Sequence, residues 1–365
     1  MASQKRLQQN PLSYKIQPLT QTQVNKKTKK LIKDINSALS LENYPLADDH
    51  IKALITLNPD PTFTIKRAHL MFIRKEYQKA EHLYKKVLKS TKEVHNQEIY
   101  FGLGQVYYES KMFYDAYLAY NILVSNYPNF KYTDFVYLRL LKIMVFYQNF
   151  DEAYNYIKII MKKGSVGTSI FAEVLVCLAL IKYKRRKLDL AIKICGKSRN
   201  LNEGFNCNLL LLILLAEKDP REAEKICSSV LNSTQDTKEW KLLCFIRAVI
   251  YIRLKKYNKA IQILEENCNN IELEAEYLNY LGIAYHGAGD KIKALEVFQE
   301  LRTKFSENYE NLNNLAYVYN ELGMKFEAFY VCNVMEGLNN GKREDLKKLE
   351  IQQMYLNPYR IIEVI

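Results

Sequence analysis

Small, apolar and aromatic residues recur along the chain in a fixed order. Residues 99–120, IYFGLGQVYYESKMFYDAYLAY, carry Leu-Gly, then Tyr three residues after the Gly, Ala twelve after it and an aromatic residue four further on. The same order returns in residues 276–301, and most of it again 34 residues later. Self-similarity at such a period is typical of a repeat array. The recurring residues are Leu103, Gly104, Tyr107, Ala116 and Tyr120, then Leu281, Gly282, Tyr285, Ala294 and Phe298, then Leu315, Ala316, Tyr319 and Ala328.

The alanine of this pattern can be followed through the whole chain at steps of 33, 36, 37, 38, 32, 37, 34 and 34 residues. We interpret each step as one pair of antiparallel helices whose backbones approach closely, with small residues facing each other and large ones around them. Repeats near residues 172–200 and 204–232 keep the alanine but lose the glycine and tyrosine. The nine alanines are Ala47, Ala80, Ala116, Ala153, Ala191, Ala223, Ala260, Ala294 and Ala328.

The glycines allow a competing hypothesis, a phosphate-binding loop. A dinucleotide or P-loop site needs a strand before its glycines, whereas IYFGLGQVYY continues as a helix. The segment GAGDK at residues 287–291 ends a helix where a phosphate loop should begin one. Gly289 and Gly323 instead fall between the two helices of a pair, where a residue with positive φ ends the first helix. We therefore predict that these glycines serve packing and turns.

The order L-G-x-x-Y…A-x-x-x-F resembles the tetratricopeptide repeat. The resemblance implies an all-α, right-handed superhelix (an α-solenoid) of about nine helix-turn-helix repeats over residues 28–338. Residues 1–27 would then be a basic arm, and residues 339–365, which include the amphipathic stretch GKREDLKKLEIQQMYL, a capping helix and tail.

Composition supports a helical protein. Gly and Pro number only 20 of 365 residues, which leaves little material for the turns of a sheet protein. The net charge of +13 is uneven: residues 1–33 carry +8, and the 45 basic and 40 acidic residues that remain leave +5. A body this close to neutral argues against a sequence-specific nucleic-acid groove, which needs a concentrated basic face. The arm is a candidate import signal, a docking segment or a solvated tail.

Cysteine usage and hydropathy indicate an intracellular protein. The seven cysteines form no C-x-x-C, so we expect buried free thiols in a reducing compartment. The longest apolar runs, VLVCLALI and LLLLILLA, have eight residues, too few to span a membrane.

No catalytic constellation is visible in the sequence, and we expect neither enzymatic activity nor a metal or other cofactor. The five histidines are dispersed, and the pairs Asp48-Asp49 and Glu265-Glu266 read as solvated helix surface. The repeat predicts instead that the first helices line a concave face that binds an extended peptide or a helix of a partner protein. The candidate partner-binding residues are Phe101, Gln105, Tyr108, Leu138, Arg139, Lys142, Asn279, Ile283, Asn313 and Tyr317.

One junction carries a more specific resemblance. Residues 127–141, YPNFKYTDFVYLRLL, are similar to the Pro-x-Phe linker and following helix start in the tetratricopeptide subunit of the fungal general transcriptional corepressor, a relative of the UTX repeat array. Phe135 and Leu141 depart from that family, which has Glu and Gly there. The matching residues are Pro128, Phe130, Val136, Tyr137, Arg139 and Leu140.

This second resemblance implies a nuclear adaptor that bridges a WD40-repeat corepressor to DNA-bound repressors, with histones as further partners. The arm and first repeats would dock the corepressor, and the middle of the concave face would meet other partners. The alternatives are a cytoplasmic or other scaffold subunit, in a cell-cycle ubiquitin ligase, a ciliary transport complex or an RNA-processing complex. An enzyme that carries a repeat array, such as a glycosyltransferase, is not expected, because the 27 residues after residue 338 are too few for a catalytic domain.

Overall fold

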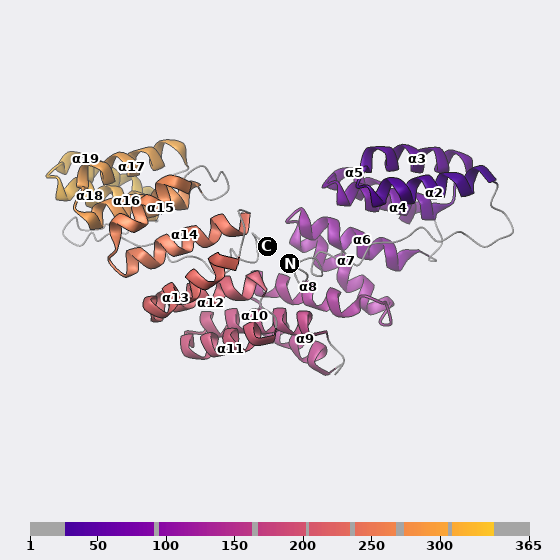
Figure 1. The fold of residues 1–365 in the computed structure, drawn as a ribbon, viewed down its shortest axis with the longest axis horizontal. Coiled ribbons are helices and arrows are strands. Elements are labelled where there is room, and N and C mark those ends of the chain that lie inside the picture. The colour runs from indigo at the N-terminus through magenta and orange to yellow at the C-terminus, as the bar shows by residue number, and fades with distance from the viewer. Residues whose placement is uncertain are drawn as a thin grey trace. The chain divides into compact units, whose positions relative to one another are not determined.

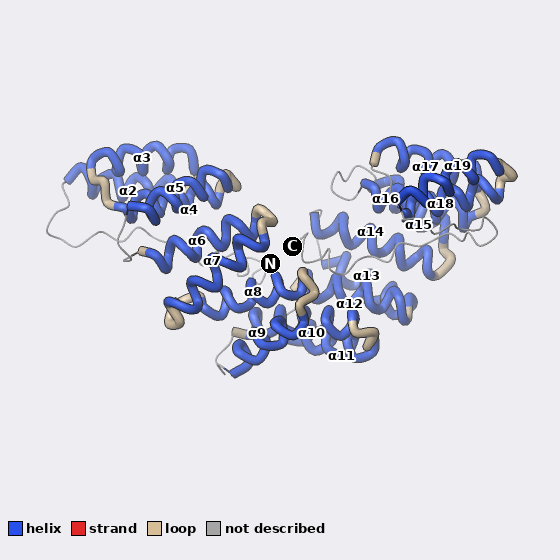
Figure 2. Tube along the Cα trace, turned by 180° about the vertical axis from the view of Figure 1, so that it is seen from behind, coloured by secondary structure: helices blue, strands red, loops and turns tan. Residues whose placement is uncertain are grey.

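A computed structural model describes residues 26–90, 95–162, 167–201, 204–233, 238–267, 274–305 and 309–338. Within these ranges every regular element is a helix (Figure 2), and there are eighteen of them. The chain divides into two compact units, residues 1–166 and 167–365. The prediction of an all-α array of about nine helix pairs is confirmed. The basic arm up to residue 25 and the predicted capping helix lie outside the described residues.

The first unit contains four helix pairs that follow one another in chain order (Figure 1). Its helices are α2 (Lys26–Ser40), α3 (Tyr44–Leu57), α4 (Pro61–Ile73), α5 (Tyr77–Ser90), α6 (Asn96–Glu109), α7 (Phe113–Asn126), α8 (Thr133–Phe146) and α9 (Phe150–Lys162).

The second unit contains five pairs, including the two degenerate ones. Its helices are α10 (Thr168–Lys184), α11 (Leu188–Leu201), α12 (Phe205–Lys218), α13 (Pro220–Ser233), α14 (Lys238–Arg253), α15 (Tyr257–Asn267), α16 (Glu274–Ala288), α17 (Lys291–Lys304), α18 (Tyr309–Glu321) and α19 (Lys325–Leu338).

All nine alanines of the repeat lie in the second helix of a pair, and each has 0% of its surface exposed. The register read from the sequence therefore holds in the degenerate pairs as well. In α12 the whole run LLLLILLA is buried, because this helix packs against α10, α11, α13 and α14. A helix that is apolar all round is typical of such an enclosed position.

Aromatic rings pack directly against the two glycines of the GLG segment. A Cβ built at Gly104 would lie 2.4 Å from Cε1 of Tyr120, the aromatic residue four positions after the alanine of the same pair. A Cβ at Gly102 would lie 2.3 Å from the ring of Tyr84, the corresponding residue of the preceding pair. The nearest neighbour of Gly104 is thus a ring and not the small residue that the sequence led us to expect.

In eight of the nine pairs the turn between the two helices contains a residue with positive φ. Gly289 and Gly323 have φ of 91° and 78°, as predicted. The backbone N–H of the next residue then bonds five residues back, as from Asp290 to the carbonyl of Tyr285 at 3.0 Å, which closes the first helix. Six other pairs place a non-glycine residue there, with φ between 55° and 62°: Glu42, Lys75, Lys111, Gln148, Arg186 and Lys255.

The repeat tyrosine connects successive pairs. The hydroxyl of Tyr107 donates to Oε1 of Glu81 at 3.1 Å, and the hydroxyl of Tyr319 accepts from Nε2 of Gln299 at 2.8 Å. The hydroxyl of Tyr285 donates to Glu265, which lies on the exposed helix surface as expected from the sequence. Each of these bonds joins a first helix to the second helix of the pair before it.

Asp48 corrects the expectation that it is a surface acid. It is 5% exposed, and its carboxylate lies 2.7 Å from Nε of Arg67 in the next pair and 2.8 Å from Nζ of Lys52. Burial acts to raise the pKa of Asp48, but the two cations outweigh it and hold the pKa below its usual value. Asp49 behaves as expected, because its side chain is 72% exposed.

The first prediction tests the contact between the ring of Tyr120 and Gly104. Gly104→Ala should lower the free energy of unfolding by about 1–3 kcal/mol, because the ring of Tyr120 is completely buried and cannot move aside without strain. Gly196→Ala is the matched control, because a Cβ at this position in the middle of α11 meets nothing within 4 Å. This replacement should raise helix stability by up to about 1 kcal/mol. Urea unfolding followed by circular dichroism measures both, and equal midpoints would contradict the packing role.

The second prediction concerns Asp48. Asp48→Asn should cost about 2 kcal/mol, the worth of hydrogen bonds to a charged group that is largely buried. Because the folded pKa is lowered, this stabilisation is present above the unfolded pKa of about 3.9 and is lost as the pH falls below it. The parent should therefore lose more stability than the variant between neutral and acid pH. Asp49→Asn should match the parent in urea titrations at both pH values, since an exposed ion pair contributes little.

Candidate partner-binding surface

The ten predicted partner-binding residues all lie on first helices, in one group per unit. Phe101, Gln105 and Tyr108 lie on α6, and Leu138, Arg139 and Lys142 on α8. In the second unit Asn279 and Ile283 lie on α16, and Asn313 and Tyr317 on α18.

Burial separates these residues into two classes. Arg139, Lys142 and Tyr317 are half-buried and keep part of their surface accessible. The other seven are buried, so they pack the helices together and show a partner little or no surface. The buried residues are Phe101, Gln105, Tyr108, Leu138, Asn279, Ile283 and Asn313.

The guanidinium of Arg139 joins α8 to α6. Its central carbon lies 4.0 Å from the ring centroid of Tyr108 and 4.9 Å from that of Phe135, while Nη2 bonds to Oε1 of Glu109 at 3.1 Å. The Arg139 side chain remains 18% exposed. We call Arg139, Tyr108, Phe135 and Glu109 the arginine cluster. Stacking on two rings fixes the plane of the guanidinium while one edge stays accessible.

The linker before α8 packs an aromatic group beside this cluster. The ring of Phe130 lies 5.2 Å from that of Phe101, and the ring of Tyr132 lies 5.5 Å from it. Thr133 Oγ1 donates to the carbonyls of Phe130 and Pro128, which closes the linker into a turn. Phe101 is therefore a packing residue. The aromatic residues of the linker, which the sequence analysis did not list as site residues, shape this part of the surface.

Two of the predicted partner-binding residues, Gln105 and Asn279, are buried amides with unused hydrogen-bonding capacity. Within the described part of the chain, Nε2 of Gln105 has no partner. Asn279 Oδ1 accepts from Nδ2 of Asn314 at 3.0 Å, but its own Nδ2 finds no acceptor among the described residues. Buried polar groups are normally paired, so each of these amides carries a desolvation cost.

The surface of α16 and α18 contains an acid that the sequence analysis missed. Glu321 lies 2.6 Å from Nε2 of His286 and 3.3 Å from Nζ of Lys291, and Tyr317 donates to its Oε1 at 3.3 Å. Partial burial acts to raise the pKa of Glu321, but the bonds from His286 and Lys291 hold it below the usual value. The 35-residue spacing of His286 and Glu321, close to one repeat, was the available signal.

The described residues contain no group of three or more His, Cys, Asp or Glu side chains arranged to hold an ion. Six cysteines are described, and all are buried thiols outside any disulfide bond, as predicted. Burial raises the pKa of the Cys227 thiol to about 12, which keeps it protonated. None of the described helices is both long and apolar enough to span a membrane.

Comparison with known families agrees with the geometry at its clearest repeat. Residues 98–129, which include α7 and nearly all of α6, match the family model of the tetratricopeptide repeat. The chain contains a tetratricopeptide repeat. Such repeats suggest a protein-interaction scaffold. No curated protein sequence matches the chain.

Solved structures with the same architecture are similar in fold at low sequence identity. A STAND signal-transduction ATPase with a tetratricopeptide repeat sensor from Pyrococcus horikoshii matches with a TM-score of 0.62 and 14% identity, over 87% of this chain and 54% of that one. The apo form of RapI matches with a TM-score of 0.52 and 14% identity, over 68% of this chain and 77% of that one. These likenesses establish a tetratricopeptide-type array of helix pairs.

The third prediction tests the arginine cluster. Arg139→Lys keeps the charge but removes the planar group that stacks on Tyr108 and Phe135, so it should cost about 1 kcal/mol of unfolding free energy. Arg74→Lys is the control: Arg74 pairs with Glu76 at 2.7 Å in a turn, and its replacement should change stability by less than about 0.5 kcal/mol. Urea titrations of both variants give the comparison, and a neutral Arg139→Lys would show that the stacking is not stabilising.

Proposed function

We propose that the protein is a non-enzymatic nuclear adaptor, the tetratricopeptide subunit of a general transcriptional corepressor. In this role it bridges a WD40-repeat corepressor and DNA-bound repressors. The observation that supports the proposal is local. The junction whose sequence resembles the corepressor family is the one that forms the arginine cluster and its aromatic linker, with Phe130 against Phe101 and Arg139 against Tyr108.

The arginine cluster has the chemistry of an interface centre. Arginine and tyrosine are enriched among the residues that carry most of the binding energy at protein interfaces. Arg139 is already held in one orientation by two rings and by Glu109, so a partner need not order it on binding. Lys142, half-buried and one turn further along α8, adds a second cation. A partner segment with a carboxylate or backbone carbonyls suits this surface.

The charge distribution suggests where the two classes of partner bind. Residues 1–33 carry +8, and α2 begins within this basic segment at Lys26. An acidic surface of the WD40 partner would be attracted to this end of the chain, whereas repressors and histones would meet the arginine cluster. Binding of DNA would be weak, independent of sequence and sensitive to salt, because it would come from the basic segment alone.

The fourth prediction tests the adaptor role. The protein tethered to a reporter promoter should repress transcription, and depletion of the WD40 partner should abolish the repression. Lys142→Glu should weaken capture of repressors about tenfold, the effect of one reversed contact worth about 1.4 kcal/mol, and leave capture of the WD40 partner unchanged. Lys187→Glu, at an exposed turn of the second unit, is the matched charge control.

Three results would contradict the proposal. They are absence of repression, localisation outside the nucleus, and a pull-down that lacks both the WD40 partner and histones. Recovery of ubiquitin-ligase, ciliary or RNA-processing subunits in that pull-down would instead assign the protein to another scaffold.

A further inference from the structure

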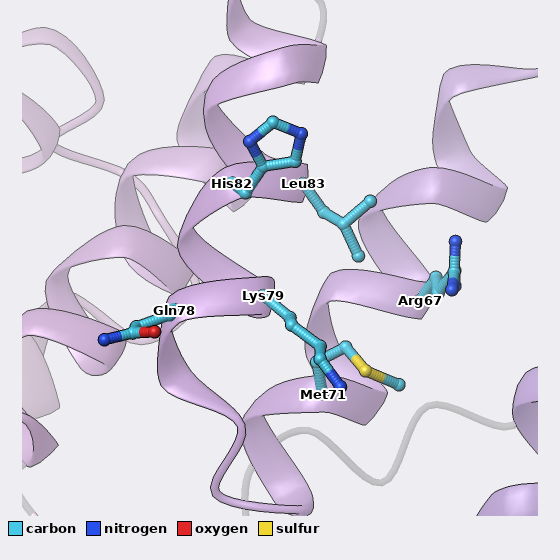
Figure 3. Close-up of a pocket in the computed structure, with 6 residues that line it drawn as sticks. All are labelled: Arg67, Met71, Gln78, Lys79, His82 and Leu83. Carbon is cyan, nitrogen blue, oxygen red and sulfur yellow. The ribbon is translucent and has the colours of Figure 1, made fainter.

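The second helix pair holds a basic hollow whose residues have no assigned role in the proposed function. Six residues of α4 and α5 line an open cavity of about 310 Å³ (Figure 3). Lys79 and Leu83 project from α5 toward Met71 and Arg67 on α4, while Gln78 points away on the other side. None of the lining residues belongs to the ten predicted partner-binding residues. The lining consists of Arg67, Met71, Gln78, Lys79, His82 and Leu83.

The floor and the rim of the basic hollow differ in chemistry. The half-buried Leu83 supplies an apolar floor, and Met71, which is 2% exposed, packs beneath it. Lys79, with a side chain that is 72% exposed, and the exposed His82 stand at the rim. The guanidinium of Arg67 is held by Asp48, because its Nε lies 2.7 Å from Oδ1 of that residue. No acidic side chain lines the cavity.

The surrounding pair is strongly basic. Residues 61–90 contain eight Lys and Arg against two Glu, a net charge of +6. Both glutamates are engaged within the fold: Glu76 pairs with Arg74 and Lys79, and Glu81 pairs with Lys85 and accepts from Tyr107. Asp48 offsets one further charge at Arg67, so the positive potential around the hollow is only partly neutralised and would attract an anionic partner.

We propose that the basic hollow binds an acidic amphipathic segment of a partner protein. One large apolar side chain of the segment packs on Leu83, and its neighbouring carboxylates pair with Lys79 and His82. The cavity volume is at the low end of ligand pockets, so it holds one or two side chains. Nucleic acid is the less favoured occupant, because its evenly charged backbone offers the apolar floor nothing to bury.

The fifth prediction tests this occupant by fluorescence anisotropy at low salt, with a labelled synthetic peptide of repeated Glu-Leu-Leu-Glu units. The full chain should bind it more tightly than the same peptide with Ser for Leu, and more tightly than oligothymidylate of equal charge. Lys79→Glu should weaken binding about tenfold, which corresponds to about 1.4 kcal/mol. Lys89→Glu makes the same charge change at an exposed position of α5 outside the hollow and should change binding by less than about twofold.

Leu83→Asn supplies a second readout, because it should reduce the preference for Leu over Ser peptides while leaving the rim charges in place. Circular dichroism confirms that each variant folds. The proposal is overturned if the Leu peptide does not bind, if the Ser peptide or the oligothymidylate binds as tightly, or if Lys79→Glu and Lys89→Glu weaken binding equally. The assay contains no corepressor, so its failure would leave the proposed adaptor role untouched.

Discussion

Close contact between an aromatic ring and the bare backbone of a glycine sets the approach of the helices where the repeat glycine is kept. Tyr84 and Tyr120 occupy the same position of successive second helices, and each ring fills the space that a side chain at Gly102 or Gly104 would need. Phe298 meets Gly282 in the same way in the second unit. A first helix can approach a ring this closely only where it lacks a Cβ, so the short residue and the large one are selected together.

At Tyr120 this contact is unfavourable in one respect, because it buries a hydroxyl group. Its hydroxyl is buried and has no hydrogen-bond partner among the described residues, and burial raises its pKa well above the usual range. Phe298 fills the equivalent place without a hydroxyl. Because an unpaired buried hydroxyl is unfavourable, the ring and not the oxygen accounts for the aromatic residue at this position. The repeat tyrosines of the first helices differ, since the hydroxyls of Tyr107 and Tyr319 each reach the preceding pair.

The sequence predicted the repeat far better than the surface. The buried alanines could be predicted because a fixed spacing acts on every pair, and Ala191 and Ala223 keep it even where the glycine and tyrosine are lost. Partner-binding residues were chosen by register alone, which does not tell whether a neighbouring pair covers them. Phe101 is enclosed by the linker that follows it, and Asp48 by the cations of two helices. Such contacts depend on side chains from adjacent pairs, whose spacing is not constant.

The residue after the repeat alanine shows how pairs are matched to their neighbours. In the first, second and sixth pairs it is Asp48, Glu81 and Glu224, which bond to Arg67, Tyr107 and Lys256 of the pair that follows. Other pairs place apolar or aromatic residues there, so the pairs are not interchangeable.

In the last described pair this residue is Phe329, and it is 47% exposed, whereas its eight counterparts are buried or half-buried. At this position the other pairs face another helix. A large ring that is half exposed here indicates that the array of described pairs ends at this point. The amphipathic sequence beyond residue 338 has the composition to cover it, which gives the predicted capping helix a physical reason.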